Sequence, residues 1–252
     1  MKEAMKRLSG MDPSDDMGDI LENIREIMND VEKAPDSTES SKALSLIREK
    51  ENASRDYFMR PFDSDEIYDR LIKVHEKRGE NDIADTYRRC LDLRQARKWT
   101  ILGDSYALMG LNSRAAGFLE KALHFGPSED LADEVRRTYE KALRRVEKAE
   151  NMVVKTTTRA DSDPGNLKNM IKALSDLLDL DRIEDASALS VEGLKRHGED
   201  LDILYRKGVA LFGKDEFGPA LEIFDKCLEM RPTSANAKRA VNLSKEMLGT
   251  GF

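Results

Sequence analysis

The 252-residue sequence has few cysteines and no long hydrophobic run. Its only cysteines, Cys90 and Cys227, exclude a fold held together by several disulfides, and we expect both thiols to be buried and reduced. No apolar run approaches the roughly 20 residues that a membrane-spanning helix needs. The basic start Met1-Lys2-Glu3 has no apolar segment behind it. We therefore expect no membrane span, no secretory signal and a cytoplasmic location.

The sequence also lacks the residue patterns of a catalytic or cofactor site. His75, His124 and His197 lie far apart, and no HExxH, CxxC, GxSxG or phosphate-binding glycine loop occurs. No segment outside the patterns described below is long enough for a second core. We expect a protein that is not an enzyme and that holds no cofactor or metal.

Charged residues make up 36% of the chain and prolines number seven, which together with frequent Ala, Leu, Glu, Lys and Arg favours an all-α fold. The net charge of −7 argues weakly against general nucleic-acid binding. The charge is uneven: residues 1–56 hold 9 Lys/Arg and 14 Asp/Glu, whereas residues 86–155 hold 14 Lys/Arg and 10 Asp/Glu.

The most regular pattern lies between residues 99 and 127. Trp99, Leu102 and Tyr106 share one helix face, and Gly103 on that face allows a second helix to come close. The polar turn 111–113 and a small–large–small series follow: Ala115, Leu119 and Ala122, with Gly126-Pro127 as the end. Such a helix pair cannot bury its apolar face alone, so similar neighbours are expected.

Similar neighbours occur further along the chain. The same slots hold Leu204, Gly208, Leu211, Ala220, Phe224, Cys227 and Pro232. One 34-residue step earlier, they hold Leu174, Leu177, Ala186, Ser190, Gly193 and Gly198 in a degenerate copy. The register slips by three residues between the first copy and this degenerate one, which predicts an irregular segment between them.

This spacing resembles that of the tetratricopeptide repeat, a helix–turn–helix unit of 34 residues. The resemblance implies an all-α, right-handed superhelical solenoid that binds a peptide or helix of a partner protein in its concave groove. One subset of the family grips chaperone tails through a Lys/Asn clamp, whose first slots hold Thr100/Asp104, Ile171/Ser175 and Tyr205/Val209 here. None of these pairs matches, although Lys168 and Lys172 resemble the later basic pair, so chaperone-tail binding is disfavoured.

Four regions are expected along the chain. Residues 1–56 form a flexible, largely disordered acidic tail with a short amphipathic helix at about 17–33, which either docks on the repeats or enters a partner's groove. Residues 57–155 form an N-terminal repeat block, which the chain enters at 58–62. Its first two helices, between Ser64 and about Arg94, form a cap or a diverged copy, and the block ends in a long helix from about Ser128 to Lys155. Residues 156–166 form a linker, because β-branched residues, Asp, Pro and Gly crowd together there. Residues 167–252 form a C-terminal block with a closing helix at 234–248.

The resemblance places the ligand on the first helix of each repeat, beside the stacking face. The expected groove residues are Arg97, Thr100, Asp104, Lys168, Ile171, Lys172, Ser175, Tyr205, Arg206, Val209 and Phe212. Ala107, Leu178 and Asp202 occupy further positions on that side. Tyr205, Val209 and Phe212 are apolar where the repeat core does not require it, so they either bind a peptide or pack against another helix. The expected ligand is apolar, with acidic groups near the basic residues.

Two other functions remain open. The chain is a candidate homo-oligomer that exchanges Met17–Val31 between copies. It is also a candidate nucleic-acid-binding repeat that uses Arg88, Arg89, Arg137, Arg144 and Arg145. Arg137, Lys141, Arg144 and Lys148 form a basic stripe at helical spacing, which either binds an acidic protein or phosphate or is solvated and paired with nearby glutamates.

Overall fold

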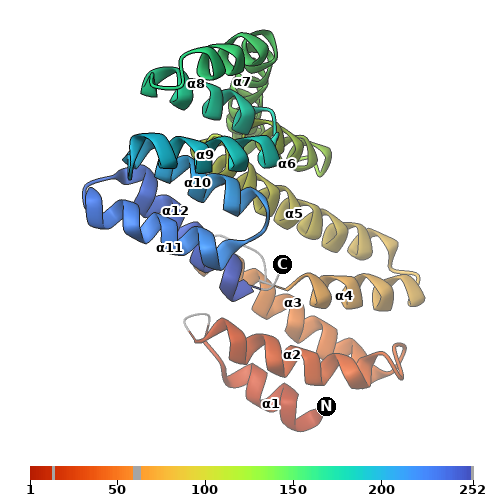
Figure 1. Ribbon diagram of the computed structural model, residues 1–252. Helices are drawn as coiled ribbons and strands as arrows, with labels where there is room; N and C mark the ends of the chain where they lie inside the picture. Colours follow the sequence, from red (N-terminus) through yellow and green to blue (C-terminus); the bar gives the residue numbers. More distant parts are fainter. Residues whose placement is uncertain (13–14, 59–63, 251–252) are drawn as a thin grey trace. The chain divides into compact units, whose positions relative to one another are not determined.

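The computed structural model describes residues 1–12, 15–58 and 64–250, and all regular structure in these ranges is α-helical (Figure 1). The expected all-α class is therefore confirmed, while the handedness of the array stays a prediction. The chain forms two compact units, residues 1–95 (unit 1) and 96–252 (unit 2).

Unit 1 contains α1 (Lys2–Gly10), α2 (Met17–Val31), α3 (Thr38–Phe58), α4 (Asp65–Lys77) and the first half of α5 (Asn81–Met109). Unit 2 contains the second half of α5, then α6 (Asn112–His124), α7 (Glu129–Ser162), α8 (Leu167–Asp179), α9 (Ile183–His197), α10 (Leu201–Gly213), α11 (Phe217–Met230) and α12 (Ala235–Thr250). Most contacts join helices that are consecutive in the sequence, as in a repeat array.

The amphipathic helix expected at about 17–33 is present as α2. All six of its patterned apolar residues are buried: Ile20, Leu21, Ile24, Ile27, Met28 and Val31. They pack against α1, α3 and α4 in the core of unit 1. Arg70 ties the polar side of α2 to α4, with its Nε donating to Glu32 at 2.6 Å.

The expectation of a flexible tail over residues 1–56 is wrong for the described residues. Residues 2–10 form a helix, and Ala4 and Leu8 place it in the unit 1 core. A break follows α2 at residues 32–37, and α3 then runs from Thr38 to Phe58. The expected domain entry at 58–62 falls mostly outside the described residues. The compact unit ends at residue 95, because the apolar faces of α1 to α3 share one core with α4.

Helix α5 is continuous where the sequence predicted two helices. The first was expected to end near Arg94 and the next to carry Trp99, yet α5 runs without a break from Asn81 to Met109. The intervening residues, Gln95 to Lys98, are good helix formers and include no Gly or Pro. The second half of α5 is thus the first helix of the first repeat copy.

Helix α7 continues to Ser162, through most of the expected linker. The hydroxyl of Thr156 donates to backbone carbonyls one turn back and to the buried Asp176 at 2.9 Å. Val153 and Ala160 are buried on the same side of the helix. Packing against α8 therefore outweighs the weak helix propensity of the threonines, and only residues 163–166 connect α7 to α8.

In both clear repeat copies, the two helices of the copy cross in the same way. A Cβ at Gly103 would lie 2.5 Å from the side chain of Leu119, and one at Gly208 would lie 2.6 Å from that of Phe224. Each glycine thus lets a large side chain of the next helix fill the crossing. In the degenerate copy the sizes are exchanged, since Leu174 and Ser190 hold these slots and both are buried. The register slip is accommodated by α7, an extra helix between α6 and α8.

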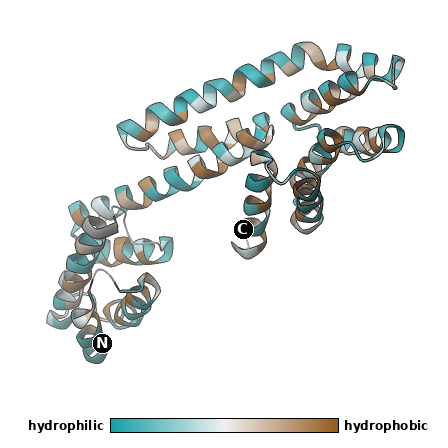
Figure 2. Cartoon of the chain, turned by 90° about the vertical axis from the view of Figure 1, so that its left-hand side faces the viewer, coloured by the Kyte–Doolittle hydropathy of each residue, from teal (hydrophilic) through white to brown (hydrophobic). Residues whose placement is uncertain are grey.

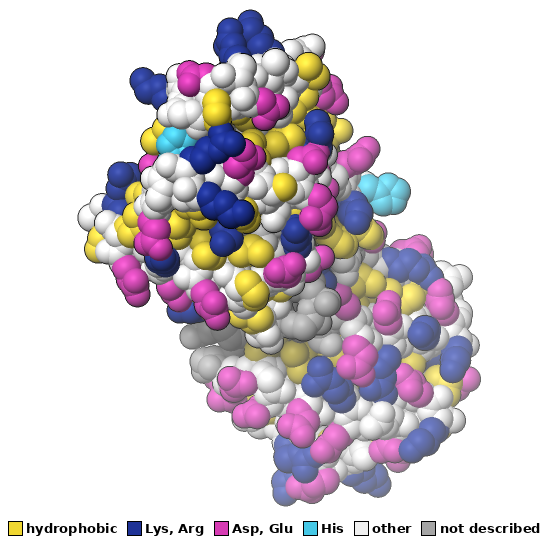
Figure 3. Space-filling view, in the orientation of Figure 1, with side chains coloured by type: hydrophobic (Ala, Val, Ile, Leu, Met, Phe, Trp, Pro, Cys, Tyr) yellow, Lys and Arg dark blue, Asp and Glu magenta, His cyan; other side chains and the backbone are white. Residues whose placement is uncertain are grey.

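Hydrophobic residues lie in stripes along the helices of both units (Figure 2), while Lys/Arg and Asp/Glu side chains intermingle on the surface seen in Figure 3. No helix among the described residues is long and apolar enough to cross a membrane. Both cysteines are buried thiols, as expected. Burial raises the pKa of Cys227 to about 11, which keeps that thiol protonated and unreactive.

The closing helix is present as α12, with Ala237 and Val241 buried.

Candidate functional site

A cleft of about 580 Å³ opens on unit 2, between helices of several repeat copies. This volume is in the range of ordinary ligand-binding pockets. Its lining comes from α5, α6, α7, α8, α10 and α12. The lining residues are Asp104, Ala107, Leu108, Met109, Gly110, Asn112, Thr138, Lys141, Ala142, Arg145, Ser175, Leu178, Asp179, Tyr205, Arg206 and Asn236.

Much of the apolar lining of the cleft comes from α5, and Ala142 of α7 and Leu178 of α8 add to it. Leu102, Tyr106 and Met109 face the unit 2 core, which turns Ala107 and Leu108 toward another side of the helix. Leu108 is 55% exposed and also lines a smaller cavity of about 260 Å³ next to α12. A large aliphatic side chain that remains so exposed inside a concave surface offers a contact for an apolar ligand group.

Two carboxyl groups of the cleft are held in surroundings that disfavour their charge. Burial raises the pKa of Asp179, although Asn112 opposes the shift by donating from Nδ2 to Oδ1 at 2.5 Å. Burial and the charge of Glu134 raise the pKa of Asp104, against a hydrogen bond from Thr138. Both groups therefore hold protons at a higher pH than an exposed Asp does.

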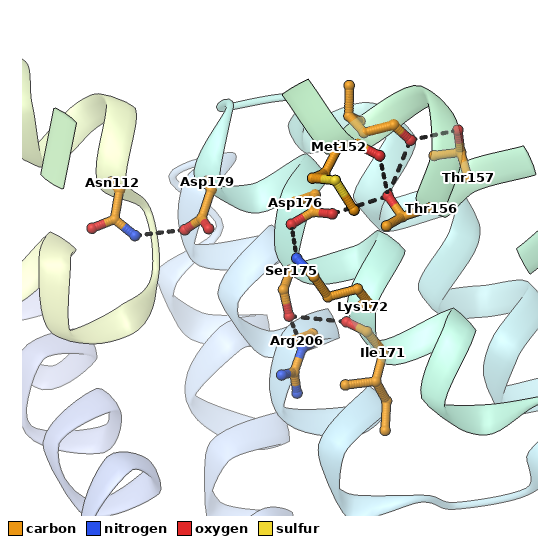
Figure 4. A network of polar contacts seen from close by, with 11 residues as sticks. Asn112, Met152, Thr156, Thr157, Ile171, Lys172, Ser175, Asp176, Asp179 and Arg206 are labelled. Atoms are coloured by element: carbon orange, nitrogen blue, oxygen red, sulfur yellow. Dashed lines mark hydrogen bonds and ion pairs between the residues drawn. The ribbon is translucent and has the colours of Figure 1, made fainter. Parts of the chain in front are cut away.

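A polar network lies behind the cleft, on α7, α8 and α10 (Figure 4). The buried carboxylate of Asp176 accepts from the Thr156 hydroxyl and pairs with the ammonium of Lys172. One turn away from Lys172, the Ser175 hydroxyl accepts from Arg206 Nε at 2.9 Å and donates to the carbonyl of Ile171. These bonds fix the polar side of α8 against its neighbours and hold the guanidinium of Arg206 in one place.

Two neighbouring side chains of α10 line the cleft, the phenol ring of Tyr205 and the guanidinium of Arg206. Burial raises the pKa of Tyr205 to about 12, so its hydroxyl stays protonated. Burial lowers the pKa of Arg206, against the charge of Asp202. Besides its bond to Ser175, Arg206 donates from Nη1 to the backbone carbonyl of Asp202. An arginine fixed in this way is oriented before a ligand arrives.

The structure brings four of the eleven expected groove residues together. Asp104, Ser175, Tyr205 and Arg206 all line the cleft. Ala107 and Leu178, which the repeat register places on the same side, line it as well. Whether any of them binds a ligand stays a prediction.

Three expected groove residues are not at the surface. Val209 and Phe212 are fully buried, and the ring of Phe212 packs against Tyr106 of α5 with a centroid distance of 5.4 Å. Thr100 is also buried, and its hydroxyl donates to the carbonyl of Ala96. The expectation that Val209 and Phe212 form a peptide-binding patch is therefore corrected: both belong to the core of unit 2.

The other expected residues lie outside the cleft lining. Arg97 and Lys168 are exposed elsewhere on α5 and α8. Ile171 is half-buried against the unit 2 core. Lys172 is engaged by Asp176. None of these four shares the cleft with Asp104 and Tyr205.

Sequence reasoning missed the contribution of α7 and of the α6 start. Lys141 and Arg145 reach the cleft from α7, a helix outside the repeat register. Asn112 was read as part of a polar turn, but it begins α6 and is buried against Asp179. The basic stripe was visible in the sequence, although nothing in its spacing placed it beside the groove.

The five arginines of the nucleic-acid hypothesis are divided between the two units. Arg88 belongs to unit 1 and pairs with Glu76 and Asp85, whereas Arg137, Arg144 and Arg145 belong to unit 2. Among the described residues, no cluster of His, Cys, Asp or Glu has the arrangement of a metal site.

No protein-family model and no curated protein matches this chain. One solved structure that matches is described as the TPR2AB-domain:pHSP90-complex of yeast Sti1. The match covers 91% of this chain and 97% of that chain, with 13% sequence identity and a TM-score of 0.32. A likeness at this level carries no argument about what this chain binds.

Proposed function

We propose that this protein is an interaction scaffold that binds a peptide or helical segment of a partner in the cleft of unit 2. The observation that carries the proposal is the cleft itself, which gathers residues from α5, α8 and α10, the first helices of all three repeat copies. The resemblance of the sequence to tetratricopeptide repeats, whose groove occupies this side of the helices, supports the same role.

The composition of the cleft supports a peptide rather than a small metabolite. Exposed Leu108 and the ring of Tyr205 offer apolar contact, while Asp104, Arg206 and Asn236 offer hydrogen-bonding groups spread along the walls. A peptide provides alternating apolar side chains and backbone groups at a similar spacing. The hypothesis of self-association through Met17–Val31 has less support, because the apolar side of α2 is already covered within unit 1.

The test is selection from a random displayed peptide library with the full chain as bait, followed by affinity measurement. Peptides enriched on the wild type should bind Leu108→Asp at least about tenfold more weakly, because a carboxylate then occupies the apolar wall. The matched control is Val154→Asp, which also replaces an exposed aliphatic residue by aspartate. Val154 is 74% exposed on α7 and lies outside the cleft. Equal loss in both variants, or no enrichment on the wild type, would refute the proposal.

A further inference from the structure

One face of α7 carries cations over most of its length. Arg137, Lys141, Arg144, Lys148, Lys155 and Arg159 follow one another at steps of four, three, four, seven and four residues, which keep them on one side of the helix. Arg145 lies beside them. These seven residues are called the α7 stripe below. Because the helix continues to Ser162, the stripe reaches Arg159 and is about 33 Å long at 1.5 Å per residue.

The charges of the stripe are poorly balanced by the protein itself. Residues 136–159 hold eight Lys/Arg and three Asp/Glu. Arg144 pairs with Glu140, but within the described part of the chain no ion pair engages Lys141, Arg145 or Lys148. The stripe therefore concentrates positive charge on a chain whose net charge is −7.

The stripe borders the cleft. Lys141 and Arg145 line the cleft and also a shallow concavity of about 460 Å³ formed along α7 by Arg137, Glu140, Arg144 and Lys148. The field of Arg145 reaches into the cleft, since its charge helps to hold down the pKa of Asp179. A ligand that lies on the stripe is thus within reach of the apolar wall at Leu108.

The surroundings of the stripe favour a narrow polyanion with carboxylate groups. Glu140, Glu147 and Glu150 line an adjacent surface of α7 with Leu143 and would repel a wide duplex or an anionic membrane laid across the helix. Tyr139 is the one aromatic residue of α7, and it packs against the unit 2 core, so the stripe itself lacks the stacking platform that single-stranded nucleic acid uses. Its length matches about ten residues of extended peptide.

We propose that the α7 stripe binds an acidic peptide segment of a partner protein, whose carboxylates lie along the stripe while an apolar side chain enters the neighbouring cleft. This inference rests on the proposed function and names the chemistry of the partner. It goes beyond the repeat pattern, because α7 lies outside the repeat register and contributes no groove position to it.

The test is fluorescence anisotropy with the full chain and labelled probes of about twelve residues. One probe is rich in Glu and contains a single Leu, a second has Gln in place of every Glu, and a third is oligouridylate of equal charge. The stripe variant is Lys141→Glu/Arg145→Glu/Lys148→Glu. The control is Lys195→Glu/Arg231→Glu/Lys245→Glu, which makes the same change of net charge at exposed positions off α7.

We expect the wild type to bind the Glu probe, with an affinity that falls as salt shortens the range of the charges, and to bind the Gln probe at least about tenfold more weakly. The stripe variant should lose at least about tenfold in affinity and the control variant less than about twofold. Equal loss in both variants, tighter binding of oligouridylate, or no binding of the Glu probe would overturn the inference. Circular dichroism checks folding, and a Lys141→Gln/Arg145→Gln/Lys148→Gln variant should lose less affinity than the reversal does.

The two proposals fail separately. One outcome is that the library yields peptides whose binding depends on Leu108 but that have no acidic bias and bind the stripe variant normally. This result would refute the acidic-peptide inference and support the proposed scaffold function. If the Glu probe binds Leu108→Asp as tightly as the wild type and the library yields no enriched peptide, the proposed function of the cleft is refuted.

Discussion

The first helices of the two clear repeat copies, α5 and α10, place matching positions in opposite surroundings. Asp104 and Ala107 of α5 line the cleft, whereas Val209 and Phe212 in the same positions of α10 are fully buried. The reverse holds one turn earlier, since Thr100 is buried and its counterpart Tyr205 lines the cleft.

The difference teaches that a position within the repeat does not determine exposure; the neighbouring helix does. Phe212 meets Tyr106 of α5 and Phe217 of α11, with ring centroids 5.4 and 5.0 Å apart. The contact with Tyr106 shows that α5 packs against α10 as well as against α6, whose Phe118 also meets Tyr106. An apolar residue in a groove position is then a core residue in one copy and a ligand contact in another.

The largest effect is expected when a buried apolar side chain and an exposed one are each truncated to alanine. Phe212→Ala should destabilise the protein by about 3–5 kcal/mol, because it leaves a cavity among packed rings. Leu108→Ala should cost less than about 0.5 kcal/mol, because that side chain is already half exposed. Urea denaturation monitored by circular dichroism measures both, and equal costs would show that Phe212 is not a core residue.

A second experiment sharpens the comparison at the helix crossings. Gly208→Ala should destabilise by about 1–3 kcal/mol, because the added methyl group would overlap the ring of Phe224. The matched change Gly117→Ala, in α6 with open space around it, should stabilise by up to about 1 kcal/mol, since Ala favours the helix over Gly. Opposite signs in thermal unfolding are the expected result; the same sign in both would contradict the tight crossing.

The smallest effect concerns the pH dependence of the cleft. Because burial raises the pKa of Asp179 above the unfolded value, the folded state binds the proton more tightly, and stability falls as pH rises from the unfolded pKa to the raised one. Asp179→Asn cannot ionise, so the loss of stability between about pH 4 and pH 7 should shrink. Urea titrations at both values measure it. Asp225→Asn, at an exposed position of α11, is the control and should leave the fall unchanged.

The sequence by itself determined the elements that depend on local pattern. The spacing of apolar residues predicted α2, α4, α6, α8 to α12 and most of α7, because burying one face of each helix needs a periodicity near 3.6 residues. The sequence also predicted a close helix approach at Gly103, and the structure shows that Leu119 fills that crossing.

Only the tertiary structure decided where helices join, where they continue and what covers them. The α5 helix runs through the boundary of the two units, and α7 runs through its expected linker, because packing outweighs modest local preferences. The burial of Val209 and Phe212 and the arrival of Lys141 and Arg145 at the cleft depend on contacts between residues far apart in the chain. Local periodicity reports which face of a helix is apolar, but it does not report which distant helix lies against that face.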